Sequence, residues 1–196
     1  RMGVPVMGKN YFPSNIQDLP TWYEIRASGH GHLARSGRVD VMVAMNAETY
    51  ARDHACVAPG GYLIYDSTWP RSTLLMRDDI TIIGVPLAKL CNENFQGVRS
   101  RILMKNISYV GVLAALLEID LEKLKELLNE TYASKASLVA ANLKAIELGY
   151  RYTKDNFECP LPFRVRTMDK TKGNIMIDGN TAAALGLSQS HHVALY

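Results

Sequence analysis

Short apolar runs recur along the first half of the chain. They lie at residues 3–7, 21–27, 39–45, 62–65 and 80–85. Most of them lack the strict alternation of apolar and polar residues that a strand with one solvent-exposed face shows. Such continuous apolar runs are typical of strands that are covered on both sides. Residues 21–27 are the exception, because apolar and polar positions alternate there. The pattern predicts five strands, most of them buried between helices.

Helical patterns fill the gaps between the later strands and most of the second half. The predicted helices span residues 47–56, 87–94, 107–119, 121–132 and 138–148. Asn46 and Asp120 are suited to cap two of them at the N-terminus, and Gly149 is suited to the left-handed position after the last one. Residues 107–119 are apolar almost all round, so this helix should be buried. We therefore expect the α/β class, with three layers in which helices flank a mixed or parallel sheet.

The pattern of apolar and polar residues changes after residue 152. Residues 157–163 contain two prolines and should be extended, because a residue that precedes proline avoids the helical region. Residues 170–173 are polar and end in glycine, which is typical of a linker. Residues 174–186 predict a short strand, a turn and the first turns of a helix.

Composition and charge exclude several classes of function. The chain has 196 residues and a net charge of +3, and no run of lysine or arginine is dense enough to indicate nucleic acid as a partner. Its apolar stretches fall short of the roughly 18–20 residues that span a membrane, and no signal peptide is visible. The three cysteines lie far apart, which favours reduced thiols and a cytoplasmic location. It also excludes an iron–sulfur cluster held by this chain alone, which usually needs four thiolates.

Two segments resemble one enzyme family. Residues 9–46 read KNYFPSNIQDLPTWYEIRASGHGHLARSGRVDVMVAMN. This stretch resembles the gamma domain of the 2-oxoacid:ferredoxin oxidoreductases, with Y-P-S-x-I, a short linker, a strand and then R-V-D-V-M-V-A-x-N. Residues 172–186, KGNIMIDGNTAAALG, resemble the opening of the alpha domain, which binds the pyrimidine end of thiamine diphosphate. Together they resemble the fused large subunit of the two-subunit enzymes, particularly those that act on 2-oxoglutarate.

The resemblance implies a division of the chain. Residues 1–153 would form the gamma domain without its first strand and glycine-rich turn, residues 154–172 a linker, and residues 173–196 the start of the alpha domain. The likeness ends after Leu187, before the Y-P-I-T-P stretch of the family. We therefore expect a fragment of a larger subunit that is inactive alone.

The resemblance also implies the chemistry. Such enzymes decarboxylate a 2-oxoacid oxidatively and pass the acyl group to coenzyme A and the electrons to ferredoxin. Thiamine diphosphate, Mg2+ and a [4Fe-4S] cluster would be held mainly by other parts of the complex, and no metal by this chain alone. The expected partners are the beta subunit, the rest of the alpha domain and ferredoxin, with no nucleic acid and no membrane.

The candidate site residues lie in two loops. Since a 2-oxo dicarboxylate and coenzyme A are anionic, we place these candidates on the side of the substrate or coenzyme A: Pro13, Ser14, Asn15, His30, His32 and Arg35. Arginine suits bidentate contacts to carboxylate or phosphate. The first three residues also favour a plain turn, and the two histidines suit an exposed loop without a ligand. A metal is disfavoured there because H-x-H has no third ligand nearby in the sequence.

Other possibilities stay open at this point. Asn180 and Thr181 begin a helix whose positive end could face the cofactor's anionic groups; the plain alternative is helix capping. The whole region could instead be an assembly domain, with the aromatic residues Trp22, Tyr23, Tyr62 and Trp69 at an interface. A nicotinamide-dependent dehydrogenase is a third possibility, although the chain contains no G-x-G-x-x-G.

Overall fold

A three-stranded parallel sheet is the centre of the fold. Its strands are β3 (Val39–Ala44), β4 (Val57–Asp66) and β5 (Thr81–Val85), side by side in that order. The register places Met42 beside Leu63 and Leu63 beside Ile82. The computed structural model describes residues 2–12, 19–35, 37–70, 76–158 and 161–189.

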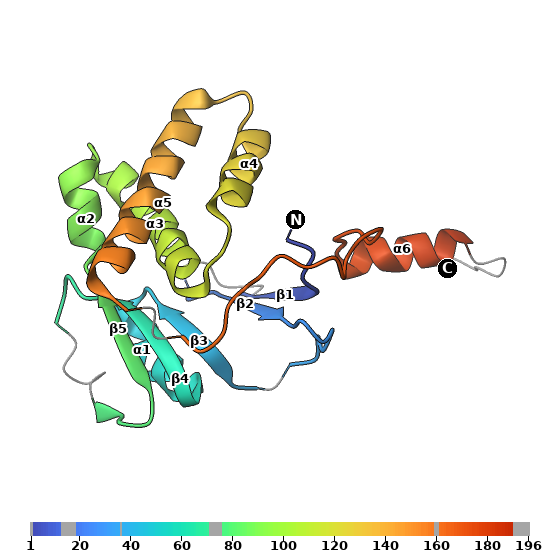
Figure 1. Ribbon diagram of the computed structural model, residues 1–196, viewed down its shortest axis with the longest axis horizontal. Helices are drawn as coiled ribbons and strands as arrows, with labels where there is room; N and C mark the ends of the chain where they lie inside the picture. The colour runs from blue at the N-terminus through green and yellow to red at the C-terminus, as the bar shows by residue number, and fades with distance from the viewer. Residues whose placement is uncertain (1, 13–18, 36, 71–75, 159–160, 190–196) are drawn as a thin grey trace.

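Helices cover both faces of this sheet. On one face Ile64 and Val85 pack against Val112 and Leu116 of helix α3. On the other face Leu63 joins a cluster that includes Tyr50 of helix α1, together with Ala44 and Val57. Figure 1 shows α3, α4 and α5 gathered above the sheet. The predicted α/β architecture of three layers is confirmed.

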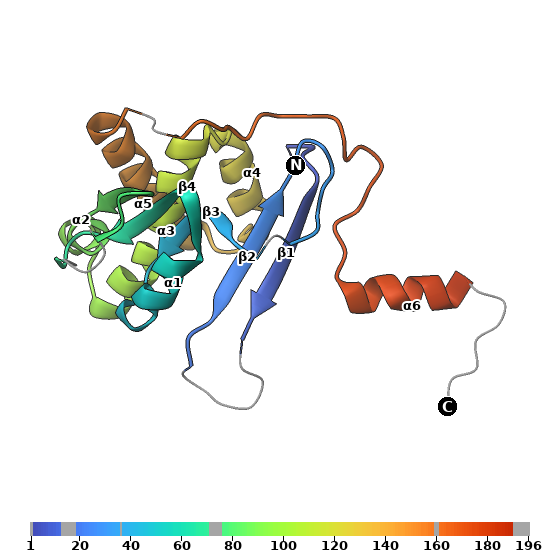
Figure 2. The ribbon, with the colours of Figure 1, turned by 90° about the horizontal axis from the view of Figure 1, so that it is seen from below.

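The first two strands form a separate antiparallel hairpin. β1 (Val6–Tyr11) pairs with β2 (Trp22–Ala27), so that Tyr11 lies opposite Trp22. Along β2, residues 22, 24 and 26 are half-buried and residues 23, 25 and 27 are exposed, so the predicted alternation of two sides is present, with Tyr23 and Ile25 on the exposed side. The hairpin lies beside the main body (Figure 2). The strand predicted at residues 3–7 was misplaced: it begins at Val6, and the carbonyls of Met2 and Gly3 accept hydrogen bonds from the amides of Met168 and Lys170 instead.

The helices largely follow the predicted order. Their bounds are η1 (Ala47–Thr49), α1 (Tyr50–Cys56), α2 (Leu87–Asn94), α3 (Val98–Leu117), α4 (Leu121–Thr131) and α5 (Ala136–Asn156). Both predicted caps are confirmed, since the side chain of Asn46 accepts from the amide of Glu48 and that of Asp120 from the amide of Glu122. α3 begins nine residues earlier than the predicted residue 107. The first turns of α3 contain Arg99 and Arg101, so the pattern of apolar positions did not indicate a helix there.

The prediction that a helix stops at Gly149 was wrong. α5 continues through this glycine to Asn156. A β-carbon at Gly149 would overlap the carbonyl oxygen of Ser108 in α3, and one at Gly111 of α3 would overlap the carbonyl oxygen of Ile146 in α5. The two glycines therefore allow the two helix backbones to touch.

α3 is also long and apolar enough to cross a membrane by length and composition, which residues 107–119 alone did not indicate. In this fold it is a central helix that packs on the sheet and on α5. Its fully buried residues include Ser108, Val112, Ala114 and Leu116.

The segment after α5 runs back across the body. Leu161 is 1% exposed and joins the core between the sheet and α3. The amide of Val165 donates to the carbonyl of Leu117 at 2.8 Å, and the amide of Met168 donates to that of Met2 at 2.7 Å. The predicted linker is therefore attached to the domain at Leu161, Val165 and Met168, while most of its other described residues are exposed.

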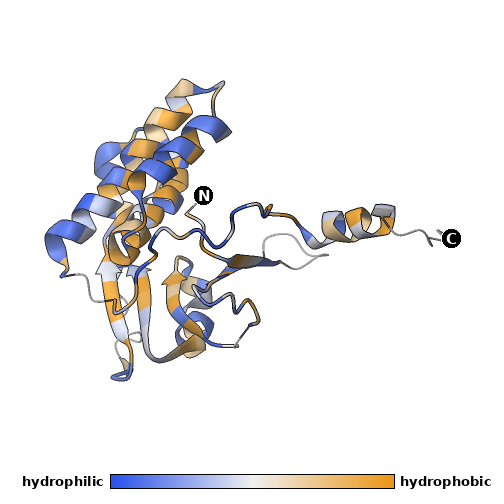
Figure 3. Ribbon diagram, turned by 45° about the vertical axis from the view of Figure 1, so that its right-hand side comes forward, coloured by the Kyte–Doolittle hydropathy of each residue, from blue (hydrophilic) through white to orange (hydrophobic). Residues whose placement is uncertain are grey.

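The end of the described chain is less embedded. The strand expected from residue 174 is absent, because residues 174–178 have no strand partner. The final helix α6 (Gly179–Gln189) follows them and stands apart from the body in Figures 1 and 2. Figure 3 shows hydrophobic residues along the parallel strands and also along much of α6. The domain boundaries at residues 153 and 172 stay predictions.

Replacing Gly111 or Gly149 by alanine should separate α3 from α5. Backbone atoms cannot move aside as a flexible side chain can, so each variant should lose about 1–3 kcal/mol of stability or more. Gly186→Ala is the matched control, because it is also a helical glycine but has no atom within 4 Å of the added carbon. Urea unfolding followed by circular dichroism measures all three, and equal midpoints would contradict the contact.

Candidate functional site

The candidate site lies where the hairpin meets the carboxyl end of β3. In open parallel sheets, ligands bind outside the carboxyl ends of the strands. Asn46 lies two residues after the end of β3, and η1 and then α1 follow it. The hairpin brings the two ends of its connecting loop, residues 12–20, to the same place.

A buried carboxylate holds the hairpin there. Asp53 of α1 is 3% exposed. The indole Nε1 of Trp22 donates to its Oδ1 at 2.8 Å, and the hydroxyl of Thr49 donates to its Oδ2 at 2.6 Å. The same hydroxyl lies 3.1 Å from the carbonyl oxygen of Asn46. A carboxylate buried to this extent needs such partners, so the network is an anchor between β2 and the end of β3.

A shallow pocket opens beside this anchor. It has a volume of about 520 Å³ and is lined by Asn10, Tyr11, Phe12, Leu19, Pro20, Trp22 and Arg52. The guanidinium of Arg52 lies over the ring of Trp22, with its carbon 3.9 Å from the ring centroid. The pocket is thus mostly apolar with one fixed cation, a common composition for a small-molecule site.

Further cations surround Tyr11 at the edge of the pocket. The Nζ of Lys9 lies 5.0 Å from the centre of its ring, and the guanidinium carbon of Arg35 lies 4.8 Å away. The Tyr11 hydroxyl donates to Glu24 at 3.2 Å, and Arg35 pairs with the same carboxylate at 2.9 Å. Partial desolvation raises the pKa of the Tyr11 phenol and the bond to Glu24 acts in the same direction, while Arg35 opposes them.

The six predicted substrate-side residues are not all brought together. Pro13, Ser14 and Asn15 lie outside the described residues, although Phe12 and Leu19 at the two ends of their loop line the pocket. Arg35 folds back along the hairpin and reaches Tyr11.

The two histidines lie elsewhere. His30 and His32 are exposed in the turn after β2, at the other end of the hairpin, and their ring centroids are 6.2 Å apart. Their amides donate to the hydroxyl of Ser28 at 3.3 and 3.2 Å, which orders the turn. The part of the chain that the structure describes contains no group of three or more His, Cys, Asp or Glu residues that could hold a metal.

Asn180 and Thr181 lie in the first turn of α6. The carboxylate of Asp178 accepts from the amide of Thr181 at 3.0 Å and from its hydroxyl at 2.6 Å. These bonds hold the pKa of Asp178 below its usual range. The chain's own carboxylate thus occupies the position that an anion would take, and these exposed residues do not by themselves fit thiamine diphosphate.

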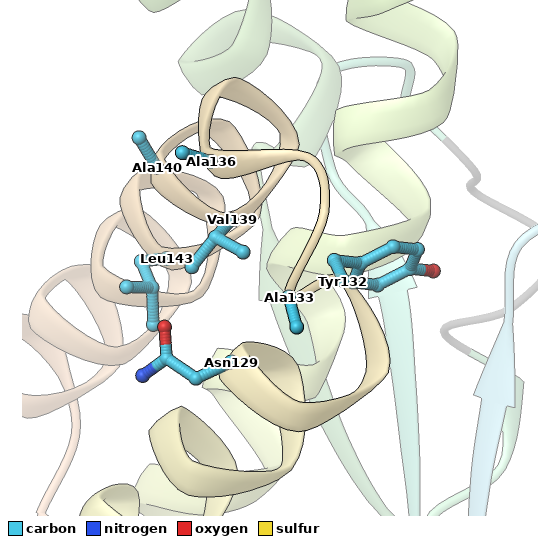
Figure 4. Close-up of a pocket in the computed structure, with 7 residues that line it drawn as sticks. All are labelled: Asn129, Tyr132, Ala133, Ala136, Val139, Ala140 and Leu143. Atoms are coloured by element: carbon cyan, nitrogen blue, oxygen red, sulfur yellow. The ribbon is translucent and has the colours of Figure 1, made fainter.

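A second pocket lies between α4 and α5 (Figure 4). Its volume is about 440 Å³, and it is lined by Asn129, Tyr132, Ala133, Ala136, Val139, Ala140 and Leu143. None of these side chains is charged or a strong nucleophile, so this pocket offers no group of catalytic residues.

Sequence reasoning missed Arg52 and Asp53. Both lie in a short helix where a charged residue is usually solvated, and only the fold shows that one is buried and that the other lines a pocket. The sequence contained one indirect indication of Asp53, which is Trp22. The indole N–H of a partly buried tryptophan needs a hydrogen-bond acceptor.

Residues 1–152 match the family described as pyruvate ferredoxin/flavodoxin oxidoreductase. The ketoisovalerate oxidoreductase subunit VorA of Methanothermobacter thermautotrophicus is 27% identical, over 61% of this chain and 24% of that protein. Subunit alpha of 2-oxoacid:ferredoxin oxidoreductase 2 of Aeropyrum pernix is 22% identical, over 95% of this chain and 36% of that protein. The chain thus spans about a quarter to a third of the length of these curated relatives.

Two solved structures are similar. One is the 2-oxoglutarate:ferredoxin oxidoreductase of Magnetococcus marinus with 2-oxoglutarate, coenzyme A and succinyl-CoA bound. It has a TM-score of 0.71 and 26% identity, over 87% of this chain and 29% of that chain. The other is the gamma subunit of a keto/oxoacid ferredoxin oxidoreductase from Geobacter sulfurreducens PCA. Its TM-score is 0.59 at 17% identity, over 78% of this chain and 82% of that chain, so it supports the fold alone.

Asp53→Ala should loosen the hairpin. It leaves the indole N–H of Trp22 without its acceptor, which should cost about 1–3 kcal/mol of stability. Asp53→Asn is the matched control, because its amide oxygen still accepts from Trp22 and Thr49 can donate to Asn46. Hydrogen exchange of the β2 amides and urea unfolding measure both variants. Equal protection in Asp53→Ala and the wild type would show that the bond does not hold the hairpin.

Proposed function

Because the chain belongs to the pyruvate ferredoxin/flavodoxin oxidoreductase family, we propose that it is the gamma-type part of an enzyme that oxidatively decarboxylates 2-oxoglutarate. The products would be succinyl-CoA, carbon dioxide and reduced ferredoxin. The observation that carries the proposal is the likeness to the Magnetococcus marinus enzyme over 87% of the chain. This coverage is larger than the family match over residues 1–152, so the likeness extends into the returning segment.

The proposed division follows the two sequence patterns. Residues 1–153 act as the gamma domain, residues 154–172 connect, and residues 173–196 open the alpha domain of a fused subunit. The beta subunit and the rest of the alpha domain complete the enzyme in the cytoplasm. We assign thiamine diphosphate, Mg2+ and the [4Fe-4S] cluster mainly to those parts of the complex, as the resemblance to the family implies.

The chain's own contribution is binding and orientation. Thiamine diphosphate supplies the carbanion chemistry when it is bound to the complex. Lys9 and Arg35 beside Tyr11 give the hairpin a basic edge suited to an anionic substrate or to coenzyme A. Pro13, Ser14 and Asn15, in the loop that leaves this edge, are proposed to contact the same ligand. His30 and His32 retain a proposed role only for the distant phosphates of coenzyme A.

A second candidate is a domain that only supports assembly. Tyr23 and Ile25 are each 63% exposed on the outer face of the hairpin, where apolar side chains would suit a subunit interface. The two functions are compatible, because the outer and inner faces of the hairpin carry different residues.

The test of activity is viologen reduction by the complete enzyme purified through this chain. It is assayed with 2-oxoglutarate, pyruvate or ketoisovalerate, each with and without coenzyme A. We expect reduction that requires coenzyme A and is fastest with 2-oxoglutarate. Absence of reduction by an intact complex that contains thiamine diphosphate would contradict the proposal, and a preference for another 2-oxoacid would correct the substrate.

Substitution of Arg35 should separate binding from assembly. Arg35→Gln removes one of the two cations beside Tyr11, so we expect turnover to fall about tenfold while the subunits stay associated. Arg151→Gln is the control, because Arg151 is an exposed arginine of α5 that pairs with Glu147. Unchanged turnover in Arg35→Gln would favour the assembly role.

A further inference from the structure

We infer that Arg52 is an anion-binding residue, held in place by Trp22 and Asp53, that takes a carboxylate or phosphate of the ligand in the hairpin pocket. This inference rests on the proposed function and adds to it a residue outside the two loops that the sequence indicated.

The first step is the placement of the guanidinium. Its carbon lies 3.9 Å from the centroid of the Trp22 ring, so the planar cation is stacked on the indole. The ring is itself fixed, because its N–H donates to the buried Asp53 at 2.8 Å. Stacking uses the face of the guanidinium and leaves its N–H donors at the edge for a planar anion. The cation is therefore oriented before a ligand arrives.

The second step is charge. No carboxylate among the described residues forms an ion pair with Arg52. Asp53, its neighbour in the chain, already accepts from Trp22 and Thr49, and Glu24 accepts from Tyr11 and Arg35. These two carboxylates are thus used within the protein, and among the described residues no carboxylate pairs with Arg52 to balance its charge at the pocket.

The third step is position and lining. Arg52 belongs to the helix that begins at the carboxyl end of β3, the edge where open parallel sheets bind ligands. Apolar side chains line the rest of the pocket, among them Phe12, Leu19 and Pro20. The fitting ligand therefore has an anionic group next to an apolar portion. The distal carboxylate of 2-oxoglutarate and a phosphate of coenzyme A both meet this description.

The test compares the complete wild-type enzyme with Arg52→Gln and Arg52→Lys. If Arg52 binds the distal carboxylate, KM for 2-oxoglutarate should rise about 10- to 100-fold in Arg52→Gln while KM for pyruvate and coenzyme A stays constant. If it binds a phosphate, only KM for coenzyme A should rise. In either case kcat should change little and Arg52→Lys should recover part of the loss. Arg151→Gln is the control and should match the wild type.

Positioning by Trp22 is tested in the same assay. Trp22→Phe keeps an aromatic face but loses the bond to Asp53, so the affected KM should rise by a smaller factor, about threefold to tenfold. If Trp22→Phe changed kcat and left KM unchanged, the role of Trp22 would be structural and not the positioning of Arg52.

Calorimetric titration with 2-oxoglutarate and with coenzyme A separates this inference from the proposed function. Ligand affinity that depends on Arg52 in an enzyme without turnover would support the anion site and contradict the reaction. Turnover with KM values that are the same in the wild type and Arg52→Gln would support the reaction and overturn the anion site. Binding of neither ligand by the wild type would overturn it as well.

Discussion

The contact between α3 and α5 is the constraint on which the rest of the fold depends. From residue 107 onward α3 is apolar on nearly every side, so this part of the helix needs to be covered by other elements. The sheet covers one side through Val112 and Leu116, and α5 covers another by backbone contact at Gly111 and Gly149. The segment after α5 then bonds to Leu117 at the end of α3. Any side chain at the two glycines would push apart the layer on which the sheet and this segment rest.

The hairpin depends on the core in a different way. A two-stranded hairpin is marginally stable by itself in water. Here one end is tied to α1 by the bond between Trp22 and Asp53. The other end is closed by the bond that the amide of Ser28 donates to the carbonyl of Pro5, and it is tied to the returning segment by the bonds that the amides of Met168 and Lys170 donate to the carbonyls of Met2 and Gly3. The basic inner face around Tyr11 is held between these two anchors, and this gives a surface hairpin a defined position for binding.

The parts of the fold that local chemistry decides could be predicted from the sequence. The parallel strands follow from continuous apolar runs, and Asn46 and Asp120 act as caps because a side-chain oxygen beside a free amide is a local arrangement. Gly149 was misread because a glycine that ends a helix and one that admits a neighbouring helix are the same residue in the sequence. Tertiary packing, which no window of sequence contains, decides between them.

The candidate site shows the same limit. Resemblance directed attention to the loops, and Arg35 does reach the pocket edge, while His30 and His32 lie at the opposite end of the hairpin. Arg52 and Asp53 gave no signal, because a charged residue in a short helix has no periodicity that separates a buried anchor from a solvated side chain. Their roles follow only from the approach of Trp22, which lies 31 positions from Asp53 in the chain.

The two ends of the hairpin have separable roles. The pocket lies at the end of Tyr11 and Trp22, whereas the returning segment pairs near Gly3 and Gly29, where the Nζ of Lys170 bonds to the carbonyl of Gly29. Five steps along a strand separate these ends by roughly 17 Å, beyond the Debye length of about 8 Å at physiological salt. Charge at one end is therefore screened from charge at the other, and the two ends are connected mechanically by the strands and by the body to which each end is bonded. The core thus sets where an anionic ligand is held, and the far end of the hairpin sets where the segment that leads to α6 leaves the domain.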